Sequence, residues 1–159
     1  MAQPADFLRA PSRRRLLQAG ALGTLAPLLP SCTEVEAKPR AIKWGRDLCE
    51  FCHMVFADRR YVAEIWDRDY NRARIYDDFG CAVLAAAEKD VLDAQDVKFW
   101  VSDERKPETW LDARAARYRD GMVSPMGYGH AAGTGPDYTL DFASAAKAIR
   151  IKADCEHKT

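Results

Sequence analysis

The sequence contains no apolar run long enough to cross a membrane. Its longest, residues 19–29, is shorter than the about 20 residues that a transmembrane helix needs. The run follows Ser-Arg-Arg-Arg-Leu-Leu at residues 12–17, and Asp6 is the only acidic residue before Cys32. A basic start, an apolar middle and small residues before a break are typical of an export signal, and the paired arginines predict the twin-arginine route. We therefore expect residues 1–31 to direct export rather than to form part of the fold.

This signal ends in Leu-Pro-Ser-Cys at residues 29–32, which resembles a bacterial lipobox with Cys32 as the lipidated residue. Residues 32–41 contain Glu, Lys and Pro with little apolar content, and they predict a lipid-anchored tether. The remainder, residues 42–159, is the length of a single small domain. We expect a membrane lipoprotein that faces the periplasm, with the outer membrane favoured over the inner one.

An excess of positive charge is also absent. The chain carries 24 basic and 24 acidic side chains, of which residues 1–32 contain four and one, so the remainder has a net charge of −3. Binding to nucleic acid and electrostatic attachment to anionic membranes both depend on clustered basic side chains. The composition therefore argues against a nucleic-acid partner and against a polybasic membrane patch.

Cysteine is scarce, and the predicted compartment makes each one informative. The compartment that exported proteins reach is oxidising, so their cysteines are usually in disulfides or bound to metal. Apart from Cys32, the chain has Cys49, Cys52, Cys81 and Cys155. Four thiols allow three complete pairings, and the sequence does not choose among them.

Soft metal ligands are concentrated in residues 49–54, Cys-Glu-Phe-Cys-His-Met. The sulfurs of Cys49, Cys52 and Met54 favour Cu(I) and also suit zinc or an iron–sulfur cluster, and His53 adds a nitrogen ligand. Two other interpretations stay open, because a Cys-x-x-Cys pair can be a redox dithiol or a disulfide, and a methionine can fill a core. A structural zinc site is disfavoured, since it uses four Cys or His ligands and the chain has no second close pair.

A second unusual stretch, residues 121–135, is rich in glycine and also holds Met126 and His130. The glycines and Pro125 predict a loop. Met126 is a candidate sulfur ligand, or else an apolar anchor for the loop. His130 is a candidate nitrogen ligand, although a solvated loop histidine is the better interpretation.

The periodicity of the sequence predicts an α+β domain. Two β-rich segments around a polar turn predict a hairpin, capped apolar segments predict two helices, and strands precede each helix. The expected elements are strands 61–66 and 72–76, a helix 79–89 capped by Asp77 or Asp78, a strand 97–101, a break at 106–108, a turn and strand within 110–119, a loop 121–135 and a helix 142–151 capped by Asp141.

Several short motifs occur in an order that resembles a known family. They are the Cys-x-x-Cys-x-Met of residues 49–54, Phe-Gly-Cys at 79–81 after a strand that ends Tyr-Asp-Asp, Trp-Leu-Asp-Ala at 110–113, and Pro-Met-Gly at 125–127. In an exported lipoprotein, this set resembles the nitrous-oxide reductase accessory (NosL) family, over about residues 45–150.

The resemblance implies a copper metallochaperone of denitrification, not an enzyme. Members of that family bind one Cu(I) and take part in copper delivery to periplasmic nitrous-oxide reductase. Their fold is a pair of ββα-like halves distantly related to organomercurial lyase. By position, Cys52, Met54 and Met126 would bind the copper. Family members often have Gly where this chain has His53, so the fourth ligand stays open, and Cys49 would be a further ligand or half of a disulfide.

An enzymatic alternative uses the same thiols. The chain could be a thiol–disulfide oxidoreductase with Cys49 and Cys52, or a lyase-like enzyme with Cys52 and Cys81. A thioredoxin-type enzyme places its Cys-x-x-Cys near a βαβ unit, whereas a hairpin is predicted here, which weighs against the first of these.

Overall fold

The computed structural model describes residues 35–156. The predicted export signal, the lipobox with Cys32 and the start of the tether lie outside the described residues. Between residues 35 and 156, no helix is both long and apolar enough to cross a membrane.

The structure confirms the predicted α+β class. Its elements are β1 (Ala63–Asp67), β2 (Arg72–Tyr76), α1 (Phe79–Glu88), β3 (Phe99–Asp103), β4 (Lys106–Asp112), β5 (Arg117–Arg119), β6 (Ala131–Gly133) and α2 (Phe142–Glu156). The first half is the expected hairpin followed by a helix.

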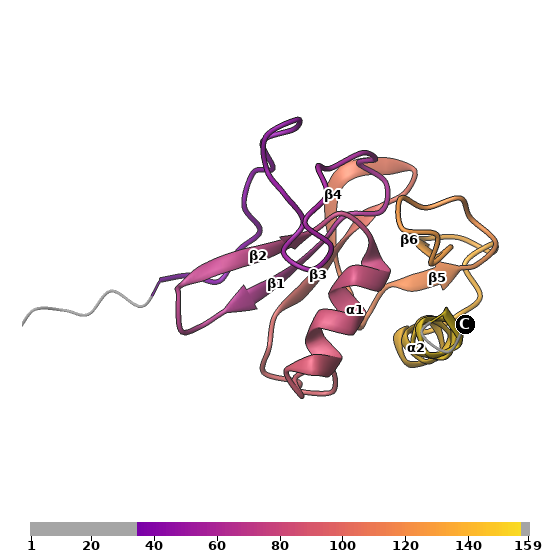
Figure 1. Cartoon of the computed structure of the whole chain (residues 1–159). Coiled ribbons are helices and arrows are strands. Elements are labelled where there is room, and N and C mark those ends of the chain that lie inside the picture. Colours follow the sequence, from indigo (N-terminus) through magenta and orange to yellow (C-terminus); the bar gives the residue numbers. More distant parts are fainter. Residues whose placement is uncertain (1–34, 157–159) are drawn as a thin grey trace, which may run out of the picture. The chain divides into compact units, whose positions relative to one another are not determined.

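All six strands belong to one mixed sheet. The strand order is β2-β1-β3-β6-β5, and β4 pairs with β3 off this path. Every pairing is antiparallel except that of β3 with β6, which joins Asp103 to Ala132. Figure 1 shows α1 and α2 next to each other on one side of the sheet, and the two helices are in contact.

The N-terminal segment of the domain covers part of the opposite face. Glu64 and Ile75 are register partners in β1 and β2, so their side chains share a face that alternates with the face of Ile65. The backbone N–H of Arg40 donates to the Glu64 carboxylate at 2.8 Å. The segment around Arg40 therefore packs against the face of the β1–β2 hairpin that carries Glu64.

The predicted pattern of the second half needs correction. Residues 106–108 do not break the sheet but begin β4, whose first residues are exposed. Pro107 is tolerated there because a proline on an exposed strand need not cost a ladder hydrogen bond. The predicted loop 121–135 also ends in a short strand, β6, so four strands rather than two precede α2.

Both helices begin at the aspartates that the sequence suggested. Asp78, rather than Asp77, caps α1 by accepting a hydrogen bond from the Gly80 N–H at 2.8 Å. Asp141 caps α2 by accepting one from the Ser144 N–H at 2.8 Å. These bonds satisfy N–H groups that the first helical turn leaves without partners.

An aromatic cluster fixes α1 against the sheet and α2. The rings of Phe79 and Tyr118 are stacked with centroids 4.5 Å apart, and Phe142 contacts both of them edge-on or tilted. Phe79 is the first residue of α1, so this packing positions the helical turn in which Cys81 lies.

Candidate metal centre

The Cys-x-x-Cys stretch folds into a closed turn. Leu48 and Val55 form an isolated antiparallel bridge at its base. Within it, the Cys49 N–H donates to the Met54 carbonyl at 2.9 Å, and the His53 N–H donates to the Cys49 carbonyl at 3.0 Å. The turn thus folds the two cysteines toward the same side, rather than along an extended segment.

His53 allows this turn to close by adopting a left-handed backbone conformation. Its φ is +61°. This conformation costs a non-glycine residue roughly 1–2 kcal/mol, although histidine is among the residues that adopt it more often. His53 is exposed, so the structure assigns this position a backbone role.

The turn is held against the edge of β2. The Glu50 N–H donates to the Ile75 carbonyl at 3.0 Å. The Glu50 carboxylate also forms ion pairs with Arg72 at 2.5 Å and Arg74 at 2.8 Å. Because β2 leads directly into α1, this attachment fixes the turn relative to the start of that helix.

The result is a cluster of three thiols. The Sγ atoms of Cys49, Cys52 and Cys81 all lie within 4.8 Å of one another. Cys49 and Cys81 are fully buried, and Cys52 is partly exposed. Three cysteines at this separation are close enough to bind a metal ion, with Cys52 on the accessible side.

Cys81 was not among the metal ligands expected from the sequence, which considered it only as a disulfide partner or a lyase cysteine. The one available signal was its place three residues after the aspartate that caps α1, which puts it in the first helical turn. No disulfide forms in the part of the chain that the structure describes, where Cys49, Cys52, Cys81 and Cys155 are all free.

The hydrogen bonds of the cluster favour one thiolate. A hydrogen bond from Cys81 lowers the pKa of Cys49 to about 5 despite burial, with further donation from the backbone near Asp77, Cys52 and Phe51. The same hydrogen bond raises the pKa of Cys81. Burial raises the pKa of Cys52. The cluster therefore favours deprotonation of the buried Cys49 thiol by lowering its pKa, and the thiolate is the form in which cysteine binds metal.

The two candidate methionines lie in different surroundings. Met54, at the end of the turn, is 55% exposed. Met126 is partly buried, and its N–H donates to the Asp78 carboxylate at 3.0 Å. Since Asp78 caps the helix that carries Cys81, the backbone of Met126 lies at the same end of α1 as the thiols.

Tight packing keeps the loop of Met126 in this place. Ser124 donates from its hydroxyl to the same Asp78 carboxylate at 2.5 Å. The Tyr128 ring covers Gly80, where a Cβ atom would lie only 2.2 Å from the ring. A residue other than glycine at position 80 would therefore push the loop away from α1.

His130 is not the solvated histidine that the sequence suggested. Its side chain is buried, Nδ1 lies 2.8 Å from the Tyr128 carbonyl, and Nε2 has no partner in the described part of the chain. The thiol cluster contains neither His130 nor His53.

The donor set fits a soft metal ion. A tetrahedral thiolate site with bonds of about 2.3 Å to zinc has sulfurs about 3.8 Å apart, so the three thiols need to move together by only about 1 Å. Sulfur donors favour Cu(I) over harder ions. No protein-family model and no curated protein matches this sequence, so the chemistry of the centre is inferred from the residues that form it.

Proposed function

We propose that this protein is an exported Cu(I) carrier that delivers copper to a periplasmic copper enzyme. The observation that supports the proposal is the cluster of Cys49, Cys52 and Cys81, in which the pKa of Cys49 is lowered. The resemblance to the NosL family makes nitrous-oxide reductase the proposed recipient, and it also underlies the proposed likeness to organomercurial lyase.

Copper is favoured over zinc by the number and kind of donors. Three thiols supply a three-coordinate sulfur site, and no histidine completes the cluster in residues 35–156. A structural zinc site uses four Cys or His ligands. Thioethers bind soft ions without losing a proton, so Met54 and Met126 are proposed as supplementary donors at the rim.

The unequal burial of the thiols suits transfer rather than permanent storage. Cys49 and Cys81 are fully buried, whereas Cys52 and Met54 face solvent at least in part. A recipient protein can replace the exposed donors first while the buried sulfurs still hold the ion. The ligand set proposed here therefore adds Cys49 and Cys81 to the Cys52, Met54 and Met126 implied by the resemblance.

The left-handed turn offers a reason for the difference at position 53. Family members often have Gly there, and glycine adopts positive φ without strain. The φ of +61° at His53 meets the same backbone requirement. We propose that His53 preserves the turn and is not the fourth ligand.

We also propose the surroundings in which the carrier works. A twin-arginine signal in residues 1–31 and lipidation of Cys32 would anchor the domain to a membrane through the tether. The proposed partners are then the copper enzyme or its assembly machinery, with no role for nucleic acid.

An oxidoreductase is less well supported by the same cluster. An attacking thiol must be both accessible and readily deprotonated. Here the thiol with the lowered pKa, Cys49, is fully buried, and the accessible one, Cys52, has a raised pKa. We therefore propose a binding protein without turnover.

Anaerobic titration with Cu(I), in competition with a chromophoric chelator, tests the proposal. The wild-type protein should bind about one Cu(I), and more tightly than Zn(II). Cys52→Ser and Cys81→Ser should each weaken copper binding by at least about 100-fold, the upper range for loss of a supporting group. Cys155→Ser is the matched control, because that thiol is exposed and outside the cluster.

The melting temperature of the metal-free variants separates a carrier from a domain held by disulfides. Cys52→Ser should change it little, since the side chains are nearly isosteric and no disulfide is lost. Losing a native disulfide costs a small secreted domain about 2–5 kcal/mol. Zn(II) binding as tight as Cu(I), or a Cys52→Ser protein that binds copper normally, would refute the proposal.

A further inference from the structure

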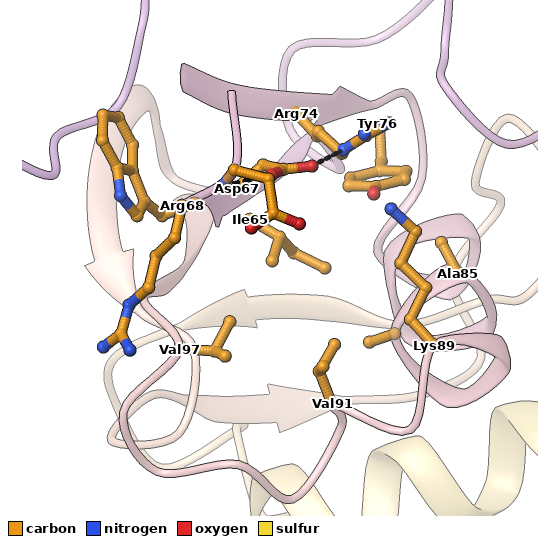
Figure 2. Close-up of a pocket in the computed structure, with 12 residues that line it drawn as sticks. Ile65, Asp67, Arg68, Arg74, Tyr76, Ala85, Lys89, Val91 and Val97 are labelled. Carbon is orange, nitrogen blue, oxygen red and sulfur yellow. Dashed lines mark hydrogen bonds and ion pairs between the residues drawn. The ribbon is translucent and has the colours of Figure 1, made fainter. Parts of the chain in front are cut away.

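A cavity on the α1 side of the sheet lies between the β1–β2 hairpin and α1. Its volume is about 300 Å³, at the lower end of the range for small-molecule sites. The turn that holds Cys49 and Cys52 contributes no residue to it. Figure 2 shows Ile65, Ala85, Val91 and Val97 lining the space between the hairpin and α1.

Tyr76 is the most unusual residue of this lining. Its side chain is only 2% exposed, but the hydroxyl oxygen itself keeps contact with the open space of the cavity and forms no hydrogen bond to any residue between 35 and 156. A hydroxyl at a cavity wall without a protein partner is available to water or to a ligand. Burial raises the pKa of Tyr76, so the hydroxyl keeps its proton and can donate.

Lys89 supplies a second donor to the same space. Its side chain extends from the end of α1 toward Tyr76 in Figure 2. The other two cations of the lining are already paired, Arg74 with Asp67 and Glu50, and Arg68 with Asp96 at 3.0 Å. Lys89 forms no ion pair in the described part of the chain, so its ammonium group is available to an anion.

The charges of the lining limit the kind of anion. Asp69 is an exposed acid of the lining without an ion pair in residues 35–156. Because Arg68 and Arg74 are already paired with acidic side chains, the ammonium group of Lys89 is the single positive charge that the lining offers to a ligand. One negative charge suits a carboxylate, whose two oxygens can accept from the Tyr76 hydroxyl and the Lys89 ammonium group together. The apolar part of the lining requires a ligand with a short apolar body.

We propose that this cavity binds a small monocarboxylate with an apolar chain, through the Tyr76 hydroxyl and the Lys89 ammonium group. The site is separate from the thiol cluster and does not depend on the proposed copper function.

Octanoate is a suitable probe, titrated into the reduced, metal-free full chain and followed by backbone amide chemical shifts. Shifts should concentrate in residues 65–69 and 85–91, which border the cavity. Tyr76→Phe should weaken octanoate binding about tenfold or more, because a hydrogen bond to a charged group is lost. Lys89→Met should weaken it about fivefold or more and remove its dependence on salt.

Two controls make the result decisive. Lys147→Met removes an exposed lysine of α2 outside the cavity and should leave octanoate binding unchanged. Octanol, which has the same chain without the charge, should bind more weakly and be insensitive to Lys89→Met. Absence of octanoate binding at low-millimolar concentration, equal binding of octanol, or binding unaffected by both cavity variants would overturn the proposal.

Discussion

Removing the carboxylate of Asp78 should be among the most damaging single changes in the domain. The side chain is fully buried and accepts three hydrogen bonds: from the Gly80 N–H at 2.8 Å, the Ser124 hydroxyl at 2.5 Å and the Met126 N–H at 3.0 Å. It therefore caps α1 and fastens the loop of Met126 to that helix at the same time.

The cost of Asp78→Ala follows from these contacts. Loss of an N-cap costs about 1 kcal/mol. Each buried donor left without an acceptor costs about 1–3 kcal/mol more, which concerns Ser124 and Met126. The sum of about 3–7 kcal/mol is a large part of the roughly 5–15 kcal/mol by which a domain is stable. Asp78→Asn should cost less, because asparagine caps as well as aspartate and loses only one acceptor.

Urea unfolding, followed by circular dichroism, measures this difference. Asp141→Ala is the matched control, because Asp141 caps α2 through one bond at an exposed site. It should cost only about 1 kcal/mol. If Asp78→Ala lowered the urea midpoint of unfolding no more than Asp141→Ala, the hydrogen bonds from the loop to Asp78 would add no stability and the reasoning would be refuted.

Three further changes test the turn, the loop and a buried acid. His53→Gly should relieve left-handed strain of about 1–2 kcal/mol, partly offset by about 0.4–1 kcal/mol because the unfolded chain gains conformational freedom. The copper affinity should stay unchanged, and a lower copper affinity would show that the imidazole is a ligand. Gly80→Ala should destabilise by about 1–2 kcal/mol in urea, because overpacking against Tyr128 outweighs the gain in helix propensity; a more stable protein would contradict the contact. Burial raises the pKa of Glu64 to about 7. The folded protein therefore keeps a proton that the unfolded chain releases above about pH 4.5. Because the folded state binds the extra proton, the free energy of unfolding should fall as pH rises from 4.5 to 7. Glu64→Gln should be close to the wild type in stability at low pH and more stable at pH 8, with both proteins metal-free, and an unchanged difference across that range would refute this assignment.

The local features of the fold could be predicted from the sequence. Alternating β-rich segments identified the hairpin, and apolar residues at helical spacing after Asp78 and Asp141 identified both helices. These signals act within about ten residues, the range over which periodicity and capping operate. Strand β6 gave no such signal, since Ala131–Gly133 is too short and too small in its side chains. Its pairing with β3 and β5 comes from the tertiary structure.

Only part of the candidate site could be predicted, because local sequence patterns do not show which distant residues come together. Cys49 and Cys52 are close in the chain, and together with Met54 they indicated a soft-metal site, with a redox dithiol or a disulfide left open. Cys81 joins them through the path of the hairpin and the start of α1, which no local pattern encodes. His130 was misjudged because a glycine-rich loop usually lies in solvent, whereas this loop folds back onto α1 through Ser124 and Met126.

The order of the strands has a consequence for folding kinetics. All three thiols precede β3, and the β1–β2 hairpin between them is a contact of short sequence separation, which forms early. The loop of Met126 can dock only after β6 has paired in parallel with β3, across about 29 residues from Asp103 to Ala132. This pairing forms more slowly because the chain between the two strands loses conformational entropy before the contact stabilises it. During this interval the thiols are close together but uncovered, so in an oxidising environment the yield of native protein should depend on whether metal or oxidant reaches them first.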